Sequence, residues 1–209
     1  MGRYLEAKCK LCRRADMKLF LKGTRCITEK CAFAKRPTPP GASQNRRRSK
    51  PSYYALQLRE KQKVKHYYGV LERQFRRYFK RAERAKGNTG EVLMSLLERR
   101  LDNVVHRLGL GLSRAQARLF VSHGHVTVNG RRVDVPSYQT RPGDVIRVKE
   151  SAKSIQLGQA NLAQVGREVP DFLSLVEGPP VEGHVLRSPE LADVSIPVQT
   201  QLIVELCSK

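Results

Sequence analysis

The positive charge of this chain is concentrated in its first half, and this asymmetry limits what that half can fold into. Residues 1–90 carry 26 Lys and Arg but only 6 Asp and Glu, whereas residues 91–209 carry 14 and 13. Such an excess of one sign opposes compaction unless an anion neutralises it. We therefore expect a polyanionic partner. Nucleic acid is the first candidate and an anionic membrane the second. A membrane span is not expected, because the sequence has no run of about 18 or more apolar residues.

The N-terminus and the cysteines indicate a reducing compartment. The sequence begins with polar and charged residues where a secretory signal would place an apolar segment. We therefore expect a cytoplasmic protein whose cysteines are reduced thiols or metal ligands rather than disulfides. We expect neither a membrane partner nor a small-molecule substrate.

Four of the five cysteines fall within residues 9–31 with the spacing C-x2-C-x13-C-x4-C. Two thiolates separated by two residues can reach one metal ion from a tight turn, and a second pair completes a tetrahedron. We predict a structural metal site made by Cys9, Cys12, Cys26 and Cys31. Zinc is favoured, and an iron–sulfur cluster is the second choice. The alternative is a set of reduced thiols packed with Leu11, Leu19 and Phe20. Cys207 is expected to be a separate buried thiol.

A basic linker and two basic helices are expected after the cysteines. Residues 34–52 offer little apolar surface, so the linker should be extended and mobile until it binds its partner. Residues 53–68 have a helical pattern. A second helix begins near Leu71, and one of its faces carries Leu71, Phe75, Tyr78, Phe79 and Ala82. Tyr78 is therefore expected to pack inside the protein rather than to stack on a base.

The candidate RNA contacts of the first half are basic side chains and one tyrosine. Flexible Lys and Arg side chains follow phosphates and release counterions, and tyrosines among them can stack on bases. The alternatives are a solubilising or localisation cluster for the linker arginines and helix packing for the tyrosines. The predicted contacts are Arg3, Arg13, Arg14, Lys22, Arg46, Arg47, Arg48, Lys50, Tyr53, Arg59, Lys61, Lys63, Arg73, Arg76 and Arg77.

The next sixty residues predict helices followed by a hairpin. A helix over residues 91–108 ends at Gly109, and Ser113 is placed to cap a short helix over residues 114–123. Asn129-Gly130 lies between alternating apolar residues, which is typical of a type I′ turn in a β-hairpin.

The remaining residues complete an α+β fold. We expect a further strand at 145–148, then a helix at 151–162 and strands at 172–176, 184–186 and 202–206. An N-terminal metal knot and helical basic domain would precede a small RNA-binding module with helices and an antiparallel sheet. The predicted domains are a cysteine knot at 1–33, a linker at 34–52, a basic helical region at 53–90, the module at 91–150, and C-terminal strands and tail at 151–209.

Residues 99–148 resemble the RNA-binding module first named for the fourth small-subunit ribosomal protein. The resemblance rests on Arg100-Leu101-Asp102-Asn103, on Ser113-Arg114-Ala115-Gln116-Ala117-Arg118, and on His123-Gly124-His125 with the following Val126-Thr127-Val128-Asn129-Gly130-Arg131-Arg132. Outside the module, residues 9–31, 53–63, 68–75, 87–90 and 202–205 resemble the bacterial-type ribosomal protein family, collinear over essentially the whole chain.

The resemblance implies a primary binder of 16S-type rRNA that nucleates assembly of the small-subunit body and contributes to translational accuracy. It also implies two kinds of partner, which are neighbouring small-subunit proteins and the mRNA near the mRNA entry channel of the subunit. In that family the second helix and the hairpin of the module face RNA. This places contacts at Arg114, Gln116, Arg118, His123, Asn129, Arg131 and Arg132, for which a solvated surface is the alternative.

Two other functions remain open at this point. Arg100-Leu101-Asp102 matches the Arg-Leu-Asp of pseudouridine synthases, which use the Asp as catalyst, but here Asp102 lies inside the module and about sixty residues follow the module. We therefore predict no catalytic residue. The other alternative is a stand-alone translational regulator that binds stalled subunits or mRNA.

Overall fold

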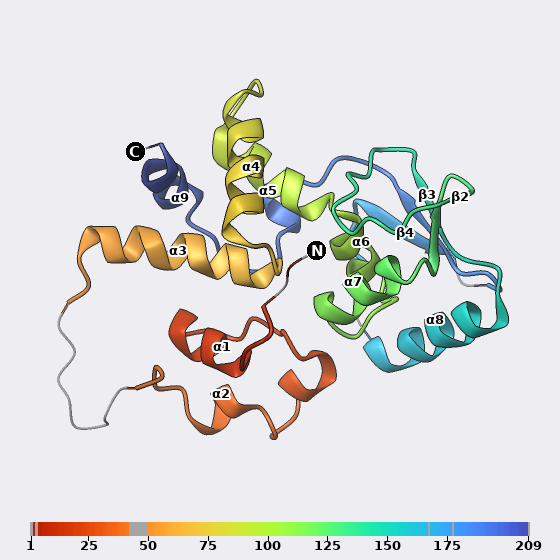
Figure 1. Cartoon of the computed structure of the whole chain (residues 1–209), viewed down its shortest axis with the longest axis horizontal. Coiled ribbons are helices and arrows are strands. Elements are labelled where there is room, and N and C mark those ends of the chain that lie inside the picture. Colours follow the sequence, from red (N-terminus) through yellow and green to blue (C-terminus); the bar gives the residue numbers. More distant parts are fainter. Residues whose placement is uncertain (1, 3, 42–49, 167, 177, 209) are drawn as a thin grey trace. The chain divides into compact units, whose positions relative to one another are not determined.

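The structure, a computed structural model, describes residues 2, 4–41, 50–166, 168–176 and 178–208. The chain divides into two compact units. Unit 1 comprises Met1–Leu93 and Ile196–Lys209, and unit 2 comprises Met94–Ser195. Unit 1 is helical, and unit 2 combines helices with an antiparallel sheet (Figure 1). The α+β fold class predicted from the sequence is confirmed.

Unit 1 begins with short helical segments that carry the cysteines: α1 (Cys9–Ala15), η1 (Gly23–Cys26) and α2 (Ala32–Lys35). The two predicted basic helices are present as α3 (Tyr53–Tyr67) and α4 (Glu72–Glu83). The Ser52 hydroxyl caps α3 by accepting a hydrogen bond from the Ala55 amide at 3.3 Å. Four residues of the predicted apolar face of α4 are buried, including Tyr78, which is 4% exposed, whereas Leu71, just before the helix, is 44% exposed.

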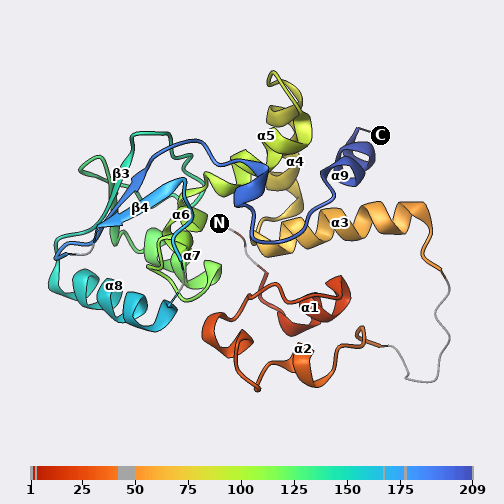
Figure 2. The same cartoon turned by 180° about the vertical axis from the view of Figure 1, so that it is seen from behind.

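The C-terminal tail is a helix, so the predicted strand at 202–206 is wrong. Helix α9 (Thr200–Cys207) lies beside α3 in both views (Figures 1 and 2). The Glu205 carboxylate accepts a hydrogen bond from Gln57 Nε2 at 2.8 Å and another from the Tyr53 hydroxyl. A short apolar run is compatible with a strand or a helix, and contacts with α3 favour the helix.

Unit 2 holds a five-stranded antiparallel sheet in the order β2-β1-β3-β5-β4. The predicted hairpin is formed by β1 (Val126–Val128) and β2 (Arg131–Arg132), with Thr127 opposite Arg132. Asn129 and Gly130 have φ angles of 50° and 76°, as a type I′ turn requires. The other strands are β3 (Val145–Val148), β4 (Leu173–Val176) and β5 (Glu182–Val185), so the sheet extends well beyond residue 150.

The sheet of unit 2 is accompanied by the helices α6 (Leu101–Arg107), α7 (Arg114–Ser122) and α8 (Ala152–Val165). A short η2 (Leu191–Asp193) follows β5. Apolar side chains of α6, α7 and the strands form one core. The core is closely packed at Gly183 of β5, where an added Cβ would lie 2.7 Å from Leu108 Cδ2.

The helix predicted over 91–108 is interrupted. It is divided into α5 (Thr89–Glu98) and α6, with Arg100 extended between them. The Leu101 amide donates to the Tyr138 carbonyl at 2.9 Å instead of continuing the helix. The apolar pattern runs through the break without a change of phase, so the prediction missed it.

Candidate nucleic-acid interface

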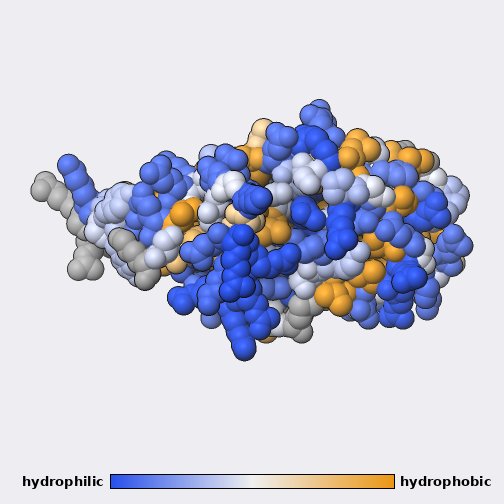
Figure 3. All heavy atoms as spheres, turned by 90° about the horizontal axis from the view of Figure 1, so that it is seen from above, coloured by the Kyte–Doolittle hydropathy of each residue, from blue (hydrophilic) through white to orange (hydrophobic). Residues whose placement is uncertain are grey.

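The face of α4 opposite its buried side is a row of exposed cations. Because 3.6 residues make one turn, the four apolar positions occupy one side and leave the basic residues on the other. These cations are Arg73, Arg76, Arg77, Lys80, Arg81 and Arg84. Among the described residues, only Arg76 of this set has a carboxylate within ion-pair distance, at 3.2 Å from Glu72. We name this row of α4 cations the α4 basic face. Hydrophilic side chains, in blue, cover most of the protein face shown in Figure 3.

Two lysines of α3 have an internal task. Lys61 Nζ lies 2.8 Å from Glu72 Oε1, and Lys65 Nζ lies 3.1 Å from Glu72 Oε2. Burial alone would raise the pKa of Glu72, but hydrogen bonds from Lys61, Lys65 and Arg76 outweigh it and lower the pKa to about 2. Lys61 is itself 8% exposed. These contacts join α3 to α4, so they position the basic face.

The other predicted contacts of α3 differ in their surroundings. Arg59 is exposed and has no carboxylate partner among the described residues. Lys63 Nζ lies 2.7 Å from Glu60 Oε1 in a half-buried pair. Tyr53 is 56% exposed, although its hydroxyl donates to Glu205. Arg59 and the ring of Tyr53 are therefore the members of this set most accessible to a ligand.

The N-terminal candidates are only partly exposed. Arg14, Lys22 and Lys50 lie on the surface, whereas the half-buried Arg13 donates to the Thr38 carbonyl at 2.6 Å. Arg13 therefore holds the chain that leads out of the cysteine region. The predicted contacts Arg3, Arg46, Arg47 and Arg48 lie outside the described residues, as does most of the basic part of the linker.

The cysteines of residues 9–31 lie near one another. Cys12, Cys26 and Cys31 are buried and Cys9 is half-buried. Burial raises the pKa values of the Cys12 and Cys26 thiols, and the neighbouring thiols raise them further. Backbone N–H groups lower the pKa of Cys31, and the Lys22 amide donates to Cys26 Sγ at 3.3 Å.

This thiol set suits zinc chemically, because thiolate sulfur is a soft donor and backbone N–H groups beside Cys12, Cys26 and Cys31 favour the thiolate form. In the described part of the chain, however, no group of three or more His, Cys, Asp or Glu side chains is arranged to hold a metal ion. Metal binding by the four cysteines stays a prediction. Cys207 is half-buried in α9, and burial raises the pKa of its thiol.

The hairpin of unit 2 presents two of the predicted cations. Arg131 and Arg132 are both exposed on β2. The guanidinium of Arg132 lies over Gly124, where an added Cβ would be 2.7 Å from Arg132 Cζ. His123 is exposed next to it. Because consecutive side chains of a strand point to opposite faces of the sheet, Arg131 and Arg132 offer a cation to phosphates on each side of the hairpin.

Asn129 has a structural task at the tip of the hairpin. Its side-chain amide donates to Asp144 Oδ1 at 2.9 Å, and its side-chain oxygen accepts from the Val145 amide at 2.9 Å. These bonds close the turn, so the side chain that was predicted to contact RNA is already engaged with the protein.

The arginines of α7 point inward, which differs from the exposed helix face that the resemblance suggests. Arg114 and Arg118 are each 9% exposed. Arg114 Nε donates to Asn103 Oδ1 at 2.9 Å, and Arg118 Nη1 lies 3.4 Å from Asp102 Oδ2. Gln116 also bonds internally, with Asn161 at 3.0 Å and the Leu112 amide at 2.8 Å. These three side chains hold α7 in place rather than presenting charge.

The Arg-Leu-Asp tripeptide is part of the same buried network. Asp102 is 4% exposed, and both of its carboxylate oxygens bind the Arg100 guanidinium, at 2.6 and 3.0 Å. A catalytic aspartate needs an oxygen within reach of its substrate. Asp102 has none free for a nucleotide, so the match to pseudouridine synthases is superficial.

Sequence reasoning omitted several side chains that matter. Lys80, Arg81 and Arg84 extend the α4 basic face, and their spacing of three, four and seven residues from Arg77 could have identified them. Arg100 and Glu98, both 0% exposed, were also missed. Arg100 pairs with Asp102, and Glu98 accepts hydrogen bonds from Asn103 and Arg107. These partners are close in sequence, but the charge pattern alone does not indicate that the pairs are buried.

Two family models together match more than two thirds of the chain. The model described as Ribosomal protein S4/S9 N-terminal domain matches residues 3–98, and the S4 domain model matches residues 99–146. The first model describes part of a ribosomal protein, and the junction of the two matches falls at the break between α5 and α6.

Curated relatives match the full length of the chain. The chain is 53% identical over 211 residues to the small ribosomal subunit protein uS4 of a strain of Thermus thermophilus. It is 54% identical over 209 residues to the protein of that name from a Thermoanaerobacter species, and 53% over 210 residues to that from Thermodesulfovibrio yellowstonii. In each case the match covers 100% of both chains. The chain belongs to the uS4 family of small ribosomal subunit proteins. No helix in the described residues is long and apolar enough to span a membrane.

Proposed function

We propose that this chain is a structural, non-enzymatic constituent of the small ribosomal subunit that binds 16S-type rRNA directly. The α4 basic face carries the proposal, because a row of exposed cations with one acidic partner among the described residues is suited to phosphates. The full-length relatives support the same function. The protein then resides with ribosomes in the cytoplasm.

The finer parts of the proposal concern its task in the subunit. We infer that the protein binds 16S-type rRNA early and nucleates assembly of the subunit body, next to other small-subunit proteins and near the mRNA entrance. A contribution to translational accuracy would follow from that place. RNA shape and phosphate geometry would dominate recognition, because the exposed candidates are mostly Arg and Lys rather than groups that read base edges.

Binding and sedimentation test the proposal together. The purified chain should bind 16S rRNA with an affinity that falls steeply as salt rises, with a slope of about 0.7–0.9 per phosphate neutralised. It should also be stoichiometric in washed small subunits. A nearly flat salt dependence would contradict direct phosphate binding, and a substoichiometric amount would instead support a stand-alone regulator.

We further propose that Cys9, Cys12, Cys26 and Cys31 bind one structural zinc ion, with an iron–sulfur cluster as the less favoured occupant. The paired spacing of the four cysteines and the burial of three of them support the proposal. Four protein ligands would leave no open position for a substrate, so the ion would stabilise residues 9–31 rather than catalyse a reaction.

A further inference from the structure

A pocket of about 220 Å³ lies between α1 and α3 within unit 1. On α3 its lining residues recur every three or four positions from Ala55 to His66, so they form one face of the helix. Pockets for drug-sized ligands measure roughly 300–1,000 Å³. The smaller volume suits a ligand about the size of one nucleotide.

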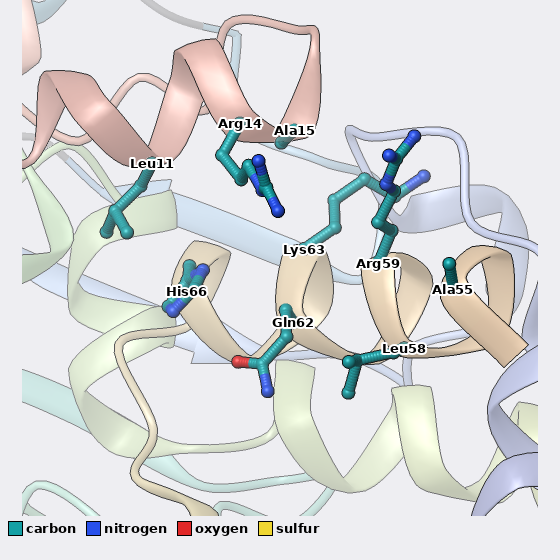
Figure 4. A pocket seen from close by; sticks show the side chains of 9 residues that line it. All are labelled: Leu11, Arg14, Ala15, Ala55, Leu58, Arg59, Gln62, Lys63 and His66. Carbon is teal, nitrogen blue, oxygen red and sulfur yellow. The ribbon is translucent and has the colours of Figure 1, made fainter. Parts of the chain in front are cut away.

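The two ends of the pocket differ in chemistry. Leu11 of α1 and His66 of α3 point toward each other at one end, while Arg14, Arg59 and Lys63 extend into the space between the helices farther along (Figure 4). No acidic side chain is among the described lining residues. One end therefore holds Leu11 and the His66 ring. Farther along, the three cations lie beside an apolar wall made by Ala15, Ala55 and Leu58.

His66 contributes a neutral aromatic ring. Burial, and to a lesser degree the Lys65 charge, lower the pKa of His66 to about 4, so the ring is uncharged near neutral pH. The ring of Tyr4 lies 6.1 Å from it, between ring centroids. Neutral aromatic rings beside an aliphatic side chain form a surface on which a base can stack.

The arginines of the pocket can bind the phosphate of a nucleotide. Arg14 and Arg59 are exposed and have no carboxylate partner among the described residues, whereas Lys63 is paired with Glu60. Two arginines from different helices can hold one phosphate with charge-assisted hydrogen bonds. An apolar side chain of a neighbouring protein would fill the aromatic end but leave both guanidinium groups without a counter-charge.

We propose that this pocket binds one unstacked nucleotide of single-stranded rRNA, with its base between Leu11 and His66 and its phosphate at Arg14 and Arg59. The proposal rests on the rRNA-binding function proposed above and adds a site where a base, in addition to the backbone, is recognised. Stacking there would be tolerant of base identity, because each base has a π-face.

Cross-linking of the unmodified complex tests the site without a substitution. The full-length chain bound to 16S rRNA is irradiated with ultraviolet light, and cross-linked amino acids are located by mass spectrometry. A nucleotide attached at Leu11 or His66 is the expected result. If rRNA binds but neither residue cross-links, the pocket proposal is wrong. If the wild-type chain does not bind rRNA, the failure lies with the proposed function.

Substitutions then measure what the site contributes. His66→Ala should weaken rRNA binding about tenfold through the loss of stacking, while His66→Phe should retain most of the affinity. His184→Ala in unit 2 is the matched control, and circular dichroism checks that each variant is folded. Unchanged rRNA affinity in a folded His66→Ala variant overturns the proposal. If the His66→Ala variant keeps its rRNA affinity but recruits neighbouring subunit proteins less well, the proposal is also wrong, and the pocket binds a protein partner.

Discussion

The Arg100 guanidinium and the Asp102 carboxylate form a two-pronged ion pair inside unit 2, with Nη2–Oδ2 at 2.6 Å and Nε–Oδ1 at 3.0 Å. Arg100 is 0% exposed and Asp102 is 4% exposed. Removing one partner of a buried pair leaves the other charge uncompensated. We therefore expect Asp102→Asn to lower the free energy of unfolding of unit 2 by about 3–5 kcal/mol, measured by urea denaturation of the full chain.

The control for this prediction is Asp134→Asn, which removes an exposed carboxylate from the same unit. It should change the free energy of unfolding by less than about 0.5 kcal/mol. If the two variants had the same free energy of unfolding, the buried Arg100–Asp102 pair would not stabilise unit 2.

Glu72 predicts a pH dependence for unit 1. Its pKa is about 2 when folded, against an ordinary value of 4.5, so its ionised form stabilises the fold. That stabilisation is complete above pH ~4.5 and is lost as the pH falls toward ~2. Because the side chain is 36% exposed, solvent screens it and we expect a contribution of roughly 1 kcal/mol.

Denaturation of wild type and Glu72→Gln across this range checks the prediction. The variant should be less stable at pH 7, and the difference should disappear near pH 2. Glu83→Gln, an exposed carboxylate at the other end of α4, is the control. A difference that is constant with pH would show that packing, rather than the ion pairs, is responsible.

Two glycines of unit 2 should respond to alanine with opposite signs. At Gly183 a Cβ would meet Leu108 Cδ2 at 2.7 Å, so Gly183→Ala should destabilise unit 2 by about 1–3 kcal/mol. At Gly158 of α8 a Cβ would lie 3.4 Å from Val148 Cγ2, which is an ordinary contact. Gly158→Ala should stabilise by about 0.5–1 kcal/mol, because Ala is the better helix former. Urea denaturation midpoints measure both changes. If both variants changed the free energy of unfolding in the same direction, the packing described at these two glycines would be wrong.

Local signals explain which elements could be predicted from the sequence. The helical face of α4, the Ser113 cap of α7 and the Asn129-Gly130 turn each depend on residues a few positions apart, and the structure confirms them. The break before α6 and the helix α9 depend on the Tyr138 carbonyl and on α3, which are distant in sequence. Those two elements were therefore missed or assigned wrongly.

The same distinction applies to the candidate site. Charge and periodicity located the first half of the α4 basic face, which comprises Arg73, Arg76 and Arg77. They could not separate Arg131 and Arg132, which are exposed, from Arg114 and Arg118, which are buried. That separation depends on carboxylate and amide groups of α6, because a buried guanidinium is stable only where such groups accept its hydrogen bonds.

The metal prediction has a direct assay. The chain purified without chelator should contain about one zinc ion, and visible absorbance would instead indicate an iron–sulfur cluster. Chelation or Cys9→Ser should unfold residues 9–31, because a structural ion contributes its binding energy to folding. Cys207→Ser should keep the metal. A metal-free chain whose fold and rRNA affinity survive Cys9→Ser would show that the thiols only pack.

The α4 basic face makes the most specific prediction for rRNA binding. Arg73 and Arg77 are exposed, and neither has a carboxylate partner among the described residues, so both can neutralise phosphates. Arg73→Ala with Arg77→Ala should weaken binding to all rRNA sequences and reduce the salt slope by about 2. Filter binding at several salt concentrations measures this, with Lys153→Ala of α8 as the control. Because neither arginine packs against the core, the free energy of unfolding should be unchanged. A loss of rRNA affinity without a change in the salt slope would place the phosphate contacts elsewhere.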